Sequence, residues 1–566
     1  VNTPDSSCNQ CHTATVQSWL ASGHLQPLYS GIKETVASGG HYNATSCAVC
    51  HTVGYAQYRT ATNANGFSDV AAAEGGLKFT QGDPDPATSL WGTNPKASKL
   101  IGIQCENCHG PQNSAGHMVS GSLSDLGTLT VPVGNSRVSY ASEVCASCHG
   151  RAMNHARYQQ WVLGAGPGKF SHGNHATYTF NADETTGALG NCQACHSAQG
   201  FAAWRKTLPN SPAYANTAVP GLTVSNAQPI TCVACHDPHN EGDADMVEAG
   251  NLTKVGATEG STYVLPGGFQ ANGVGKGALC ITCHNSRTGM ITAAPYSSTA
   301  PGYNLHEDGT TWAAFATPTS YSAPHEACQG DVLMGRNAYW LGADKYNSTS
   351  TRSKHSYITD TCVTCHMDLT DPSPYGAAGQ KRHDFVATLD ICNTCHTAYS
   401  GEAVQTAFDA QLKIVKQAVG QAILRLKYND SIPAGTTAVL VANRQGQIDV
   451  TTSGVTRRWF ISTRANNDAF LTDPNNNGAL VQGCAGTATL ASCTGYLAGV
   501  ATPTATTLAL TGSNVAISST GVNAVIAKAL WNTVLVQDDA SRGIHNPSFT
   551  ANVMGQSVSH VMNFTP

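Results

Sequence analysis

Hydrophobic positions recur with a helical period in two stretches near the C-terminal end of the chain, residues 402–428 and 521–537. Their apolar side chains lie three or four positions apart: Val404, Phe408, Leu412, Val415, Val419, Ala422 and Leu426 in the first stretch, and Ile526, Leu530 and Val534 in the second. This spacing predicts two amphipathic helices, each with one apolar face. Ser400 can cap the start of the first helix, and Pro433 lies beyond its end.

Between these helices the pattern changes to one that favours strands. Residues 434–520 are rich in Thr, Ala, Val and Gly, and within them residues 437–442 and 457–463 are predicted β-strands. An Asn-Asn-Asn-Gly run at 475–478 predicts a turn. The pattern therefore indicates a small β-rich insertion between the two helices.

The first 400 residues keep neither period for long. Gly, Pro, Asn and Ser recur there and favour loops joined by short helices, one of them predicted over 331–341. Charged residues make up only 11% of the chain, well below the roughly 25% of an ordinary soluble domain. Because large apolar side chains are also sparse in this part, something else must supply its buried bulk.

Several classes of function are disfavoured by composition. No run rich in Lys and Arg is present, so nucleic acid is not an expected partner. The most apolar stretch, 515–536, is interrupted by polar residues and by Lys528, so no membrane-spanning helix is expected. The chain begins at Val1 without a charged and apolar leader, and we expect that any export signal has been removed.

Cysteine carries the strongest signal. Of the 21 cysteines, 18 form nine copies of Cys-x-x-Cys-His. In chain order the copies are Cys8, Cys11 and His12; Cys47, Cys50 and His51; Cys105, Cys108 and His109; Cys145, Cys148 and His149; Cys192, Cys195 and His196; Cys232, Cys235 and His236; Cys280, Cys283 and His284; Cys362, Cys365 and His366; Cys392, Cys395 and His396. This is the attachment sequence of c-type haem, so nine covalent haems c are predicted.

The spacing of the motif follows from the chemistry of attachment. Two thiols add to the two vinyl groups on one edge of the porphyrin, and the next residue then lies under the iron, where His supplies a neutral imidazole ligand. A zinc site is the alternative for paired cysteines. Zinc motifs combine a distant second pair and do not require His at the next position, so nine adjacent histidines favour haem.

Three cysteines remain outside the motifs. Cys484 and Cys493 lie in a Gly- and Thr-rich segment, and we expect them to form a disulfide; two free thiols are the alternative. Haem attachment takes place outside the cytoplasm, where disulfides also persist. Cys328 stands alone and is expected to be a buried, inert thiol.

The histidine count permits a second axial ligand for every iron. Nine of the 22 histidines complete the motifs, which leaves 13 for the nine open positions. Ten have a favourable context: His24, His41, His117, His155, His175, His239, His325, His355, His383 and His545. His175 is preferred to the nearby His172, and His306 and His560 are weaker candidates. Two axial histidines close the iron to substrate, whereas an enzyme needs an open position.

The predicted fold class is a multihaem cytochrome c, packed around its haems. The motifs are irregularly spaced and each unit is too short for its own core, so the porphyrins form the core, wrapped by loops and short helices. We expect a nonahaem domain over 1–400, a long helix over 401–433, a β-rich insertion with the disulfide over 434–520, and a C-terminal helix with a late haem ligand over 521–566. The two long helices form a C-terminal helix pair in this prediction.

The sequence resembles the outer-surface multihaem cytochromes of metal-reducing bacteria. The resemblance rests on the nine motifs and on phrases such as Cys-Val-Ala-Cys-His-Asp-Pro-His at 232–239 and Gly-Ile-His-Asn-Pro at 543–547. It covers residues 1 to about 430 and the final 45, but not 434–520. It implies a secreted protein at the cell surface or outside the cell, with the periplasm as the alternative. Some members of this broader group polymerise into filaments, and the resemblance therefore implies self-association into a nanowire.

The leading hypothesis is an electron carrier rather than an enzyme, passing electrons from a donor chain to an extracellular acceptor or a redox partner protein. A terminal reductase with one open haem, a soluble electron shuttle and a docking role for 434–520 are the alternatives. Ammonia-forming nitrite reductases usually carry a Cys-x-x-Cys-Lys motif, and this sequence has none. The formal net charge of −5 becomes about −14 if each of nine ferric haems adds one negative charge, so a basic redox partner is expected.

Overall fold

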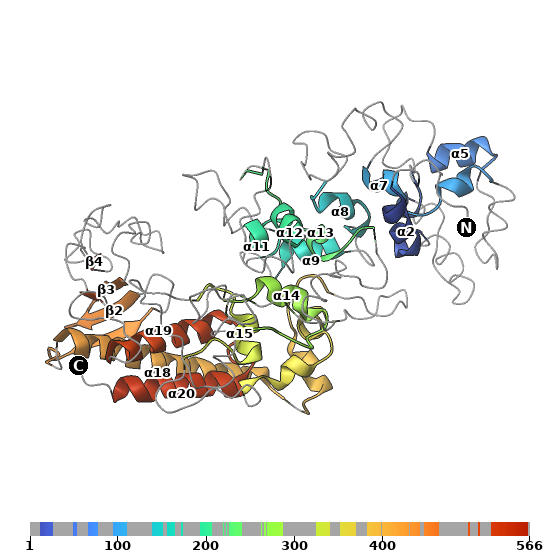
Figure 1. The fold of residues 1–566 in the computed structure, drawn as a ribbon. Helices are drawn as coiled ribbons and strands as arrows, with labels where there is room; N and C mark the ends of the chain where they lie inside the picture. Colours follow the sequence, from blue (N-terminus) through green and yellow to red (C-terminus); the bar gives the residue numbers. More distant parts are fainter. Residues whose placement is uncertain are drawn as a thin grey trace, which may run out of the picture. The chain divides into compact units, whose positions relative to one another are not determined.

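A computed structural model describes the following residues: 9, 12–25, 49–53, 66–76, 94–109, 139–150, 156–164, 171–173, 193–205, 219, 222–223, 226–239, 262, 265, 267, 269–286, 324–339, 351–368, 382–397, 399–428, 431–441, 447–462, 496–497, 508–509 and 522–563. The chain divides into two compact units, one of residues 1–251 and 363–388 and one of residues 252–362 and 389–566 (Figure 1). Each is described by itself.

The first unit contains short helices, and the longest described one has nine residues. They are α2 (Thr13–Ala21), α5 (Phe67–Ala73), α7 (Cys105–His109), α8 (Glu143–His149), α9 (Arg157–Leu163), α11 (Gln193–His196), α12 (Ala198–Arg205) and α13 (Cys232–Cys235), with 3-10 turns η1 (Gly23–Leu25) and η3 (Ala97–Leu100). Among its described residues, the buried apolar side chains include Trp19, Trp161 and Trp204. The short helices agree with the composition of this part.

The second unit combines haem motifs with the longer elements. It contains α14 (Gly277–Cys283), α15 (Gln329–Met334), η8 (Lys354–Tyr357), η9 (Leu389–Thr394), α18 (Gly401–Tyr428), α19 (Val522–Asp538) and α20 (Pro547–Met562). Its strands are β1 (Thr436–Leu440), β2 (Gln447–Thr452), β3 (Val455–Ser462), β4 (Tyr496–Leu497) and β5 (Leu508–Ala509). Helix α17 (Cys362–His366) starts at Cys362, the last residue of the segment 252–362 of this unit. Its other four residues belong to the first unit.

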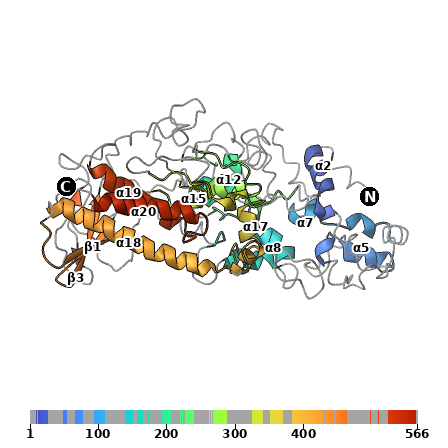
Figure 2. The same cartoon turned by 90° about the horizontal axis from the view of Figure 1, so that it is seen from below.

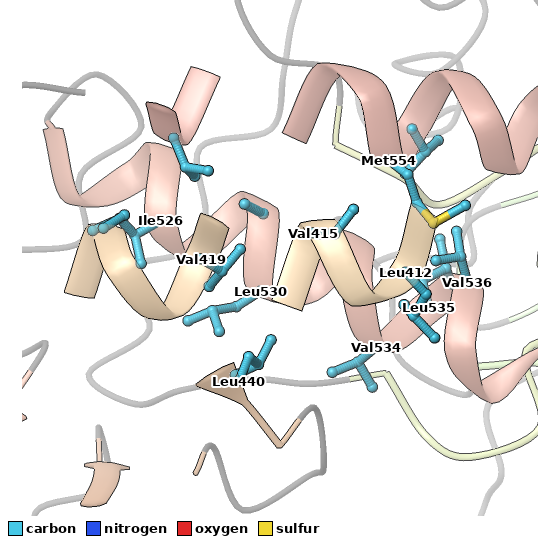
Figure 3. Close-up of a cluster of buried hydrophobic side chains, with 14 of the residues drawn as sticks. Leu412, Val415, Val419, Leu440, Ile526, Leu530, Val534, Leu535, Val536 and Met554 are labelled. Carbon is cyan, nitrogen blue, oxygen red and sulfur yellow. The ribbon is translucent and has the colours of Figure 1, made fainter. Parts of the chain in front are cut away.

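Helices α18, α19 and α20 lie side by side and form the apolar core of the second unit, as both ribbon views show (Figures 1 and 2). Val415 and Val419 of α18 are completely buried, as is Leu530 of α19 (Figure 3). Leu440 of β1 and Met554 of α20 belong to the same cluster. Burial of one such side chain contributes roughly 1.5–3 kcal/mol to the free energy of unfolding. Because this cluster contains many of them, it contributes strongly to the stability of the second unit.

Both helices predicted from the periodicity are present, but the predicted pair is incomplete because α20 packs against both. Helix α20 was missed since its sequence mixes small and polar residues, including Gly555. Its start does carry a local signal: the Asn546 side chain accepts a hydrogen bond from the Phe549 amide at 3.3 Å, and Pro547 is the first helical residue.

The β-rich insertion forms a sheet in the order β1-β2-β3-β4, with β5 parallel to β3. The predicted strands at 437–442 and 457–463 correspond to β1 and β3. Strand β2 between them was missed, although buried Ile448 and Val450 alternate with Asp449. Ser453 and Gly454 form the two-residue hairpin turn between β2 and β3, both with positive φ. The predicted turn at 475–478 lies outside the described residues.

The helix predicted over 331–341 starts earlier and is shorter, as α15. It ends where Gly335 takes φ of 63° and a Cβ atom would lie 2.1 Å from the Thr351 carbonyl oxygen. Only glycine fits that close approach. Within the described part of the chain, no helix is both long enough and apolar enough to span a membrane.

Candidate haem-binding sites

Each fully described Cys-x-x-Cys-His motif lies on about one helical turn. In α7, α8 and α17 the whole motif is helical, and α13 and α14 end at its second cysteine. In three motifs the histidine amide donates to the carbonyl oxygen of the first cysteine at 2.8 Å, at His236, His284 and His396. This bond closes the turn and fixes the imidazole relative to both sulfurs, as attachment to one porphyrin edge requires. Cys8, Cys11, Cys47 and Cys192 lie outside the described residues.

The histidines that complete motifs meet histidines from distant parts of the chain. Four such pairs have ring centroids 6.0 to 6.5 Å apart. They are His149 with His24 at 6.5 Å, His109 with His239 at 6.0 Å, His236 with His383 at 6.0 Å, and His396 with His355 at 6.1 Å. Every pair combines one motif histidine with one histidine predicted as a distal ligand.

This spacing fits one iron between the two rings. A metal–nitrogen bond of about 2 Å and a further distance of about 1.1 Å from nitrogen to ring centre would place the centres of two imidazoles on opposite sides of one metal ion about 6.2 Å apart. Direct contact between two rings would bring the centres much closer in a stacked arrangement. The spacing of the rings therefore fits one haem iron between each pair, in which His24, His239, His355 and His383 each face one motif histidine.

Hydrogen bonds at Nδ1 orient several of these rings. Nδ1 of His355 lies 3.0 Å from the Ile544 carbonyl oxygen, and Nδ1 of His366 lies 2.9 Å from that of Phe385. Nδ1 of His284 lies 3.3 Å from Oε1 of Gln329. When Nδ1 donates to such an acceptor, the tautomer leaves the Nε2 lone pair for a metal.

Burial keeps several candidate ligands neutral. It lowers the pKa of His24, of His239 and of His355. The carbonyl of Pro238 hydrogen-bonds to His24 and partly offsets this effect on its pKa. Neutral imidazole is the form that binds iron, so the pKa shifts agree with ligation at neutral pH.

The remaining predicted ligands fall into two groups. His325 and His545 are described: Nδ1 of His325 lies by the Glu326 carbonyl oxygen, and Nδ1 of His545 lies 2.6 Å from Oδ1 of Asp539. Burial lowers the pKa of His545, but the charge and hydrogen bond of Asp539 outweigh this and raise it. His41, His117, His155 and His175 lie outside the described residues. His172, the alternative to His175, packs edge-on against Phe385 at 4.7 Å.

The carboxylate of Asp539 and the carbonyl of Pro238 are functional groups that sequence reasoning missed. Asp539 is six residues before His545, and no motif marks that distance. Pro238 lies within the phrase Cys-His-Asp-Pro-His, whose rigidity was a signal that could have been read.

Cys328 is completely buried, and Sγ lies 3.2 Å from the His325 carbonyl oxygen. Burial, the largest cause, raises the pKa of its thiol well above the ordinary value. The expectation that this thiol is buried is confirmed, and its raised pKa disfavours the reactive thiolate. Cys484 and Cys493 lie outside the described residues.

Different motifs of the first unit also touch one another. The Gly102 amide donates to the His51 carbonyl oxygen at 2.9 Å, and Asn107 donates to that of Thr52 at 3.0 Å. Sγ of Cys148 lies 3.9 Å from the Cys50 carbonyl oxygen.

The fourth and sixth motifs also lie close together. The amide and Sγ of Cys232 each lie 3.2 Å from the hydroxyl of Ser142, the residue before helix α8, which contains the fourth motif. Attached haem would convert these thiols to thioethers, so their contacts report proximity and not lasting hydrogen bonds. The second, third, fourth and sixth motifs are thus neighbours.

Two family models match parts of the chain. Residues 104–297, which hold the third to seventh motifs, match the model described as outer membrane cytochrome MtrC/MtrF-like, domains II/IV. Residues 7–74, which hold the first two motifs, match the model of cytochrome c554 and c-prime. No curated protein sequence matches the chain. The crystal structure of outer cell wall cytochrome OcwA is similar over 99% of each chain, with 13% identity and a TM-score of 0.44.

Proposed function

We propose that this multihaem c-type cytochrome, which is similar to cytochromes of the outer cell surface, carries electrons along nine covalent haems with two axial histidines each. The observation that carries the proposal is the set of four histidine pairs with ring centres 6.0 to 6.5 Å apart. When bound, the haem iron supplies the one-electron chemistry. The protein supplies its two ligands and fixes its surroundings.

Paired histidines favour electron transfer over the reductase alternative. A substrate must reach an open coordination position, and a second histidine fills that position. In this proposal His24, His239, His355 and His383 take that role on the fourth, third, ninth and sixth haems, numbered by motif. His41, His117, His155, His175, His325 and His545 are proposed for the remaining irons, one more than those irons require.

The order of haems in the first unit follows from shared peptide segments. Residues 232–239 attach the sixth haem, supply His239 to the third, and hold His24 of the fourth through the Pro238 carbonyl. Contacts of the second motif with the third and fourth extend this group. We therefore propose that the second, third, fourth and sixth haems form one continuous electron path.

The similarity to outer-surface cytochromes supports a location at the cell surface or outside the cell, with an external acceptor or a basic redox protein as partner. The low content of charged residues, 11% of the chain, supports self-association into a filament, because weak electrostatic repulsion permits close contact between copies. Negative-stain electron microscopy of the native protein tests the filament: fibres of uniform width support it, and compact particles alone refute it.

The proposal as a whole is tested by mass and spin state. Nine haems add about 0.6 kDa each to the chain mass, and paired histidines make every iron low-spin. We expect an intact protein mass equal to that of the chain plus nine haems, and no high-spin signal in the electron paramagnetic resonance spectrum. A high-spin signal that carbon monoxide or nitrite perturbs would instead favour a reductase with an open haem, and fewer than nine haems would refute the count.

A further inference from the structure

The second unit contains a short contact between His545 and the buried carboxylate of Asp539; at His239, by comparison, the Asp237 carboxylate lies 3.7 Å from Nδ1, beyond hydrogen-bond distance. We propose that Asp539 is a positioning residue that orients the His545 imidazole and lowers the reduction potential of the haem iron that His545 binds. This inference rests on the proposed function, in which His545 is an axial ligand.

The contact is short, buried and fixed from several sides. Oδ1 of Asp539 lies 2.6 Å from Nδ1 of His545, and the Asp539 side chain is 0% exposed. Asp539 follows the last residue of α19, and its amide donates to the Leu535 carbonyl oxygen at 3.3 Å. The Ser541 hydroxyl donates to Oδ2 of Asp539 and accepts from the His545 amide at 3.0 Å. The carboxylate is thus held in place before any metal binds.

The loop that carries this contact is also anchored on its exposed side. Arg542 forms an ion pair with Asp409 of α18. Gly543 takes φ of 90°, and a Cβ atom there would lie 3.3 Å from the Phe408 ring. The turn from α19 to α20 is therefore fixed on both sides, and His545 cannot rotate away from Asp539 without breaking several contacts.

Other oriented rings use weaker acceptors. His355 and His366 face backbone carbonyl oxygens, and His284 faces a side-chain amide oxygen. A carboxylate accepts a stronger hydrogen bond from Nδ1 and gives the ring imidazolate character. The added electron density at Nε2 stabilises ferric over ferrous iron. Because Asp539 is buried, salt and water screen its charge little.

Asp539→Asn tests this inference because asparagine keeps the shape and an acceptor oxygen but removes the charge. In a spectroelectrochemical titration of the full holoprotein, we expect about one ninth of the absorbance change to move to higher potential. Ser541→Ala removes the hydrogen bond that draws charge to Oδ2, so it should move the same component to lower potential. A purely structural disturbance would not give shifts of opposite sign.

Glu402→Gln is the matched control, since it removes one acidic charge at an exposed position of α18 that takes no part in the contacts described above. We expect it to leave the titration unchanged. His545→Ala tests the ligation itself by producing one high-spin iron. A high-spin iron in His545→Ala together with unmoved potentials in Asp539→Asn and Ser541→Ala overturns the inference but leaves the proposed function. A fully low-spin His545→Ala protein overturns the assignment of His545 as a ligand as well.

Discussion

Replacement of His239 by alanine should open one haem and only one. His239 faces His109 at 6.0 Å with ring planes 4° apart, so it is placed to supply the sixth ligand of the third haem. Its neighbours Cys232, Cys235 and His236 attach the sixth haem and stay intact. We therefore expect all haems to remain attached, because thioether bonds and His109 do not depend on His239.

The magnitude follows from the count. One open haem of nine converts about one ninth of the iron to high spin, measured by double integration of the electron paramagnetic resonance signal. His560→Ala is the control, because His560 lies in the last turn of α20 and was a weak ligand candidate. A wholly low-spin His239→Ala protein would refute the pairing. High-spin iron at two or more haems would instead mean that residue 239 holds neighbouring sites together.

Three further predictions concern ring geometry, pH and packing. The His109–His239 ring planes are nearly parallel (4°), so we expect a rhombic low-spin signal from that haem in the electron paramagnetic resonance spectrum, and His239→Ala should remove it. The His355–His396 ring planes are nearly perpendicular (89°), so we expect a strongly anisotropic low-spin signal, and His355→Ala should remove it. Burial raises the pKa of Asp331 to about 6 from 3.8, despite hydrogen bonds from Ser286 and Asn337. The folded state therefore holds a proton that the unfolded state loses as pH rises from 4 to 6, and this carboxyl should cost about 2.4 kcal/mol of stability at pH 7 relative to pH 4. In Asp331→Asn this part of the pH dependence should vanish from urea unfolding curves followed by circular dichroism; an unchanged pH dependence would contradict the assignment. Leu530→Ala should reduce the unfolding free energy of the second unit by roughly 2–5 kcal/mol, whereas Ile414→Ala, at an exposed position of α18, should change it by less than about 1 kcal/mol.

Sequence reasoning selected histidines that face a motif histidine, but it could not say which motif each one faces. His24, His239, His355 and His383 were all chosen from local context, and each faces a motif histidine. The partner could not be inferred, because chain distance does not report it. His383 lies shortly before Cys392 but faces His236 of the sixth motif.

The fold shows a similar limit. Helices α18 and α19 were predicted because their apolar residues keep the helical period. Helix α20 was missed because its buried face includes polar residues, Thr550 and Ser557, whose burial depends on partners elsewhere. Ser557 meets Asn532 of α19 at 3.1 Å, a tertiary contact that no local pattern announces.

The direction of synthesis gives the four histidine pairs different assembly histories. His24 precedes Cys145 and His149 in the chain, and His355 precedes His396, so for those two irons the second ligand has already emerged when the haem is attached. For His109 and His236 the order is reversed, because their partners His239 and His383 lie later in the chain. In the proposed ligation, the third and sixth haems would therefore keep an open coordination position until the later histidine of each pair emerges. Of the four paired sites, these two would be the ones open to other ligands and to oxygen before the chain is complete.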